Sequence, residues 1–89
     1  MNLQERISYL RRPRDYWDNT PELHNIFAGK SGFDWFIRRA ARQLIQAGAI
    51  VQLGNRKFVD SELFIPVALQ VLSNEAANRE GNQLVRGAA

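Results

Sequence analysis

The chain has 89 residues and a net charge of +3, with 45% hydrophobic and 24% charged residues, which is the balance of one small folded domain. Cysteine is absent and His24 is the only histidine, which excludes disulfides, thiol nucleophiles and metal sites built from several such residues. His24 itself is interpreted as a surface or helix-end residue and not as a functional one.

The sequence favours a binding protein over an enzyme. We find no paired acids beside a nucleophile, no phosphate-binding glycine loop and no metal-ligand spacing, so we expect no catalytic residue, no metal and no cofactor. The first ten residues lack the apolar core of a signal peptide, and no apolar run is long enough to span a bilayer. We therefore expect a cytoplasmic protein with no membrane partner.

Basic residues concentrate in the middle of the chain. Residues 30–59 contain six basic residues and one acidic residue, whereas residues 15–29 contain three acidic residues and neither Lys nor Arg. This distribution predicts one positively charged surface, which either binds a polyanion or is simply solvated.

The segment Asn2–Arg12 predicts a short amphipathic helix, which Pro13 ends because a prolyl ring disfavours helical geometry in the residue before it. Its apolar residues at helical spacing are Leu3, Ile7 and Leu10. The arginines of this region are either an arm that contacts phosphates or the polar face of a helix packed on the domain. We favour the packed helix, with some arginines still able to reach a phosphate. These arginines are Arg6, Arg11, Arg12 and Arg14.

Two large aromatic residues, Tyr16 and Trp17, lie in a predicted loop over residues 15–19 and are expected to pack on the core. The next helix is predicted over Pro21–Ala28, followed by a turn at Lys30. Its start and stop signals are the capping residue Thr20, the first-turn Pro21 and the C-terminal Gly29.

The sequence Ser31-Gly32-Phe33-Asp34 is a capping signal that predicts a longer helix from Ser31 to Ala47, stopped by Gly48. A short helix, a glycine turn and a longer helix are together typical of a helix-turn-helix. The predicted buried face contains Phe33, Phe36, Ile37, Ala40, Ala41, Leu44 and Ala47. The opposite face contains Trp35, Arg38, Arg39, Arg42, Gln43 and Gln46.

Arginine and glutamine are side chains that reach phosphates and base edges, so this exposed face predicts contact with DNA. The alternative is a solvated face, but the adjacent helix-turn-helix pattern favours contact. Trp35 is interpreted as a residue at the edge of the core, in preference to a contact with sugar and phosphate. Asp34 is interpreted as a helix cap.

Residues 49–59 change to a period of two and predict a β-hairpin with its turn at Gly54-Asn55. The expected cross-strand pairs are Val51 with Phe58 and Ile50 with Val59. The tip carries Arg56 and Lys57, which suits contact with the DNA backbone or the minor groove.

A C-terminal helix is expected to be capped by Asp60 or Ser61. Pro66 requires either a separate first turn or a helix start near Ile65. The apolar positions of this helix are Leu63, Phe64, Val67, Ala68, Val71 and Leu72. We expect a single domain over residues 1–80, with its motif core at about 20–73, and a flexible tail over residues 81–89.

The order of these elements resembles the winged-helix excisionases, which are recombination directionality factors within the MerR-like and excisionase-like DNA-binding domains. It is most similar to the conjugative-transposon type, in which an Arg-Arg pair on the recognition helix precedes a Gly-Asn-Arg wing. Here Arg38-Arg39 precedes Gly54-Asn55-Arg56 by the fourteen residues Ala40–Leu53. The resemblance covers about Pro21 to Leu72.

The elements and the resemblance together predict an α+β, mostly helical fold: a winged helix-turn-helix with one two-stranded wing and a C-terminal helix. The resemblance implies a sequence-specific protein that binds and bends double-stranded DNA near an attachment site and directs a tyrosine recombinase (integrase) toward excision. It also implies that copies of the protein associate cooperatively on DNA. The expected location is the nucleoid, within the cytoplasm.

Two alternatives remain open. One is a transcriptional regulator of the same fold on a phage or another mobile element, and the other is a winged helix that binds a protein instead of DNA. The residues expected to contact DNA are Lys30, Ser31, Trp35, Arg38, Arg39, Arg42, Gln43, Gln46, Asn55, Arg56 and Lys57.

Overall fold

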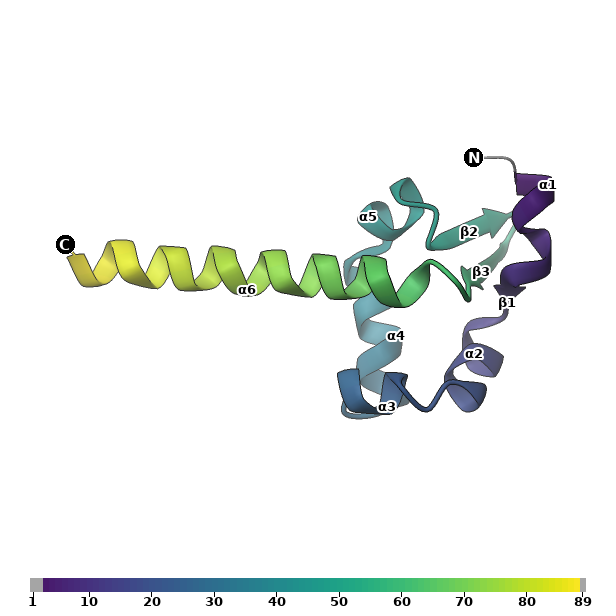
Figure 1. Cartoon of the computed structure of the whole chain (residues 1–89), viewed down its shortest axis with the longest axis horizontal. Coiled ribbons are helices and arrows are strands. Elements are labelled where there is room, and N and C mark those ends of the chain that lie inside the picture. The colour runs from purple at the N-terminus through teal and green to yellow at the C-terminus, as the bar shows by residue number, and fades with distance from the viewer. Residues whose placement is uncertain (1–2, 89) are drawn as a thin grey trace.

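The computed structural model describes the backbone of residues 3–88 and the side chains of residues 3–78. The fold is α+β and mostly helical, with one three-stranded antiparallel sheet in the strand order β1-β3-β2 (Figure 1). In chain order the elements are α1 (Leu3–Arg6), the 3-10 helix η1 (Ile7–Tyr9), β1 (Leu10–Arg11), α2 (Pro13–Asn19), α3 (Leu23–Ile26), α4 (Lys30–Arg39), α5 (Ala41–Gln46), β2 (Ile50–Leu53), β3 (Arg56–Asp60) and α6 (Phe64–Ala88).

The N-terminal segment departs most from its predicted structure. The expected helix over residues 2–12 is reduced to α1 and η1, and Leu10–Arg11 forms a strand that pairs with β3. Of the three residues expected to pack on the domain, Leu3 and Ile7 are exposed, at 42% and 62%, and only Leu10 is half-buried. The predicted packing is therefore wrong at Leu3 and Ile7. The continuous helix does not form because the backbone of Leu10–Arg11 makes its hydrogen bonds with β3, a strand far along the chain. This pairing outweighs a weak local helix pattern.

Residues 15–19 belong to helix α2, so the predicted loop is wrong. Pro13 starts this helix instead of ending the one before it, because proline suits a first helical position where no backbone donor is needed. The expectation that Tyr16 and Trp17 pack on the core is confirmed, since both are buried. Helix α2 therefore presents its aromatic residues inward and leaves Arg14 exposed.

The predicted helix over Pro21–Ala28 contains only the four helical residues of α3. The helix predicted from Ser31 to Ala47 is two helices, because the chain leaves helical geometry at Ala40 (φ −100°, ψ 15°) between α4 and α5. No proline or glycine marks this break. The predicted side-chain caps do not form: Gly29 holds the N-cap position of α4, and the Lys30 ammonium pairs with Asp34 at 2.8 Å.

The hairpin agrees with the sequence analysis residue by residue. Val51 lies opposite Phe58 and Ile50 lies opposite Val59, as the two-residue turn predicts. Gly48 and Gly54 have positive φ values of 80° and 63°, where a residue with a Cβ would be strained. The added third strand, β1, extends the sheet on the β3 side.

The start of α6 is fixed by Asp60, which is 1% exposed. Its Oδ1 accepts hydrogen bonds from the backbone N–H groups of Glu62 and Leu63, each at 3.0 Å, so Asp60 caps a separate turn over residues 61–63 that leads into α6. Pro66 is the third residue of α6, within the first turn, where no intrahelical donor is lost.

Helix α6 projects from the body of the molecule (Figure 1). Its backbone stays helical through residues 81–88, where the sequence analysis expects a tail. The flexibility of that segment stays a prediction, and residue 89 lies outside the described residues.

The core is an aromatic cluster between α2, α4 and α6. Phe33 is fully buried and its ring centroid lies 5.3 Å from that of Trp17 and 5.5 Å from that of Phe64. The predicted buried face is confirmed at Phe33, Phe36, Ile37, Ala40 and Leu44, whereas Ala41 is half-buried and Ala47, just after α5, is exposed. The Tyr16 hydroxyl is buried without a hydrogen-bond partner among the described residues, and burial raises its pKa to about 12.

Candidate nucleic-acid interface

The outward faces of α4 and α5 carry the side chains that the helical spacing predicts. Arg38, Arg42, Gln43 and Gln46 are all exposed, and among the described residues neither Arg38 nor Arg42 forms an ion pair. Trp35 lies on the same face of α4 and is 63% exposed, so its interpretation as a residue at the edge of the core is wrong. A large exposed aromatic side chain beside arginines is available to a ligand.

Arg39 differs from its neighbours on α4. Its guanidinium pairs with the Glu75 carboxylate on α6 and lies 5.6 Å from the centroid of the Phe36 ring. These contacts join α4 to α6. The predicted DNA contact of Arg39 stays a prediction, in competition with this ion pair.

The hairpin tip and the start of α4 border the same hollow. Asn55, Arg56 and Lys57 are exposed, and neither Arg56 nor Lys57 pairs with an acid in the part of the chain that the structure describes. Lys30 lines a hollow of about 510 Å³ together with Arg56 and Lys57. Ser31 follows on the exposed surface of α4, so of the residues expected on α4 the structure brings Lys30 to the same hollow as the tip.

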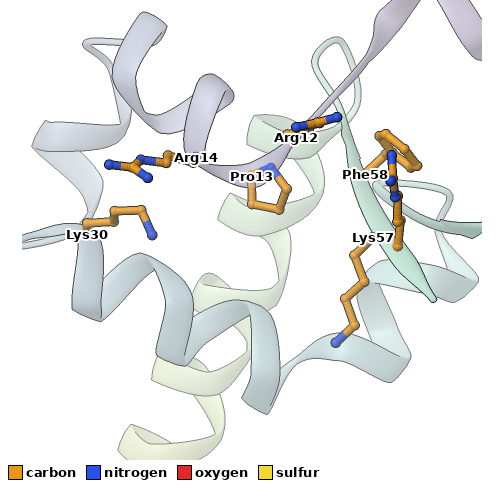
Figure 2. Close-up of a pocket in the computed structure, with 7 residues that line it drawn as sticks. Arg12, Pro13, Arg14, Lys30, Lys57 and Phe58 are labelled. Carbon is orange, nitrogen blue, oxygen red and sulfur yellow. The ribbon is translucent and has the colours of Figure 1, made fainter.

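Two residues outside the predicted site line the same hollow. They are Arg12 and Arg14, at the start of α2 (Figure 2). The sequence offers one signal that finds them, because Pro13 at a first helical position places its two neighbours at the start of a helix. That helix is anchored by its buried aromatic residues, so both arginines are held beside the hairpin.

The other two N-terminal arginines have structural partners. Arg6 donates from Nε to Asp60 Oδ2 at 3.0 Å and from Nη2 to Asp60 Oδ1 at 2.8 Å, and its Nη1 donates to Glu62 Oε1 at 3.0 Å. Arg11 donates to the carbonyls of Ser8 and Leu10. Arg6 thus fixes α1 against the start of α6.

Asp60 has a lowered pKa. Burial by itself would raise it, but the hydrogen bonds from Arg6 and from the Leu63 and Glu62 amides stabilise the charged form by more. The pair joins the end of α1 to the end of β3 and lies apart from the hollow, since neither Arg6 nor Asp60 lines it. It therefore serves the fold.

Metal-binding groups and membrane-spanning helices were each sought in the described part of the chain. No group of three or more His, Asp or Glu side chains is placed to hold a metal ion there. Among the same residues, no helix combines the length and the apolar character that crossing a bilayer requires.

Comparison of the chain with protein-family models, with curated proteins and with solved structures finds no match in any of the three.

Proposed function

We propose that the protein binds double-stranded DNA through the outward faces of α4 and α5 and the tip of the β2–β3 hairpin, in the manner of a winged helix-turn-helix. One observation carries the proposal: the outward faces of α4 and α5 and the hairpin tip expose cations, Arg38, Arg42, Arg56 and Lys57, that form no ion pair among the described residues. Lys30, at the start of α4, lines one hollow together with Arg56 and Lys57 of the tip.

The chemistry of these side chains suits two kinds of contact. Arginine and glutamine on α4 and α5 match base edges in a major groove. Arg38, near the end of α4, and Arg42, near the start of α5, are both exposed. The hairpin tip offers charge without a fixed hydrogen-bonding pattern, which suits phosphates. Sequence discrimination therefore belongs to the helices and general affinity to the tip.

For the biological role we propose a recombination directionality factor that bends DNA near an attachment site and steers a tyrosine recombinase toward excision. This part rests on the resemblance of Arg38-Arg39 and Gly54-Asn55-Arg56 to the excisionase pattern. A transcriptional regulator would share the same DNA contacts, so the two roles separate only in a recombination assay with the integrase of the same mobile element.

The test of DNA binding is a fluorescence anisotropy titration of the full chain. The probes are a duplex from the attachment region of that element and a random duplex of equal length. In Arg38→Ala/Arg42→Ala we expect specific affinity to fall by about 1–3 kcal/mol for each arginine that reads a base. Circular dichroism checks that the variant stays folded.

The matched control is Arg79→Ala/Arg86→Ala, which removes the same charge from the distal part of α6 and should leave the preference between the two duplexes unchanged. Equal loss on both duplexes in the α4–α5 variant would assign its arginines to phosphates. Unchanged binding by a folded variant would overturn the recognition surface. If the unmodified protein binds neither duplex at low salt, the protein-binding alternative replaces this proposal.

A further inference from the structure

The hollow between α2, α4 and β3 has an unusual lining. Its walls are formed by Arg12, Pro13, Arg14, Lys30, Arg56, Lys57 and Phe58, so five of its seven residues are cationic and none is acidic (Figure 2). The cations come from three elements that are separate in the sequence. The fold therefore gathers positive charge that no single segment carries.

The backbone around the hollow is held in place before any ligand arrives. Arg11 pairs with Val59 across β1 and β3, so the chain leaves the sheet with Arg12 beside the outer half of β3. Tyr16 and Trp17 then anchor α2 in the core. Because the hairpin register is also fixed, a ligand would order side chains but little backbone, which lowers the entropic cost of binding.

Most of the gathered charge is not neutralised by the protein. Lys30 pairs with the exposed carboxylate of Asp34 at 2.8 Å, but Arg12, Arg14, Arg56 and Lys57 form no ion pair with any residue whose side chain the structure describes. Like charges held together repel one another, so this arrangement favours an anionic ligand.

The form of the hollow indicates which anion. All five cationic side chains are exposed, which suits a ligand that stays largely in solvent and not an enclosed metabolite. The guanidinium fork matches two oxygens of one phosphate, and arginines enter from the α2 side and from the β3 side. Pro13 and Phe58 add apolar surface to the lining, against which the sugars of a nucleic-acid strand can pack.

We propose that this hollow binds the phosphodiester backbone of one DNA strand, with Arg12 and Arg14 as contact residues opposite Arg56 and Lys57. The inference rests on the proposed function and deepens it, because it adds α2 to the interface. The strand in the hollow passes beside the start of α4, which leaves the outward face of that helix for the bases. Contacts with phosphates carry no sequence information, so the hollow contributes affinity and register alone.

The test compares Arg12→Ala/Arg14→Ala with the control Arg79→Ala/Arg86→Ala, which has the same net charge. Each full-length protein is titrated against the attachment-region duplex and the random duplex between 50 and 200 mM salt. For the α2 variant we expect weaker binding to both duplexes by the same factor. We also expect the slope of log affinity against log salt to become shallower by about two units, one for each lost phosphate contact.

The outcomes separate the two proposals. A smaller salt slope in the α2 variant with an unchanged slope in the control supports the strand in the hollow. An unchanged slope in a folded α2 variant, while Arg38→Ala/Arg42→Ala still weakens binding, overturns this inference and leaves the proposed function standing. A changed preference between the duplexes would assign the α2 arginines to bases and overturn the phosphate role. If the unmodified protein binds neither duplex, both proposals fall.

Discussion

Apart from Arg11, which donates to backbone carbonyls, the basic residues whose side chains the structure describes form two groups that differ in what they touch. In the first group each cation is paired with an acid. Arg6 pairs with Asp60 and Glu62, Lys30 pairs with Asp34, and Arg39 pairs with Glu75. The unpaired cations, Arg12, Arg14, Arg38, Arg42, Arg56 and Lys57, have no acidic partner among the described side chains.

This comparison shows that closeness in sequence does not decide the role of an arginine. Arg6 and Arg12 belong to the same basic N-terminal run, yet Arg6 holds a buried carboxylate and Arg12 lines an open hollow. Burial of Asp60 makes its ion pair a matter of stability, whereas exposure of the unpaired cations leaves them to an external ligand.

The largest effect is expected from Asp60→Ala. The substitution removes the cap of the turn that leads into α6 and leaves Arg6 without its main partner, so the free energy of unfolding should fall by about 3–5 kcal/mol. Urea unfolding followed by circular dichroism measures it. The control Asp34→Ala breaks the exposed pair with Lys30 and should cost no more than about 0.5 kcal/mol. Equal losses in the two variants would contradict the distinction between buried and exposed pairs.

Acid should weaken the same contact. Because the pKa of Asp60 is lower in the folded protein than in the unfolded chain, its contribution is complete above the ordinary carboxyl pKa of about 4 and is lost as the pH falls through the folded value. Unfolding free energies measured from pH 7 to pH 2 should show this loss. The difference in unfolding free energy between the unmodified protein and Asp60→Asn should become smaller as the pH falls. A difference that stays constant over this range would argue against this role of Asp60.

A smaller effect, of the opposite sign, is expected for DNA binding by Asp34→Ala. The change frees Lys30, which lines the hollow, and removes one negative charge from its edge. We expect tighter binding to any duplex and a salt slope steeper by up to about one unit. Anisotropy titrations at several salt concentrations measure both. Weaker binding would mean that the pair with Asp34 positions Lys30 instead of competing with DNA.

The smallest change is expected from Arg39→Ala. Its guanidinium is engaged with Glu75 on α6, so the variant should lose at most about 1 kcal/mol of stability and keep the salt slope of the unmodified protein. Arg38→Ala, the adjacent exposed arginine, is the matched comparison. A loss of affinity in Arg39→Ala as large as in Arg38→Ala would show that Arg39 leaves Glu75 to contact DNA.

Local patterns in the sequence were sufficient for the hairpin, the cap and the inward face of α4. The turn glycine Gly54 requires positive φ and fixes the register, which pairs Val51 with Phe58. Asp60 precedes an apolar helical pattern, and its side chain caps the turn that leads into that helix. The exposure of Arg38 and Arg42 follows from helical periodicity alone.

Tertiary packing decided the features on which the candidate interface depends. Leu10–Arg11 is too short to carry a periodic signal, and it becomes a strand because β3 supplies its hydrogen-bond partners. The break at Ala40 and the exposure of Trp35 likewise have no local mark in the sequence. The hollow combines residues from α2, α4 and β3, and the choice between a paired and an unpaired arginine depends on which carboxylate the fold brings near. The sequence by itself determined the hairpin and the inward face of α4, because these features depend on neighbouring residues. Only the tertiary structure determined where the positive charge collects, because the hollow depends on residues far apart in the chain.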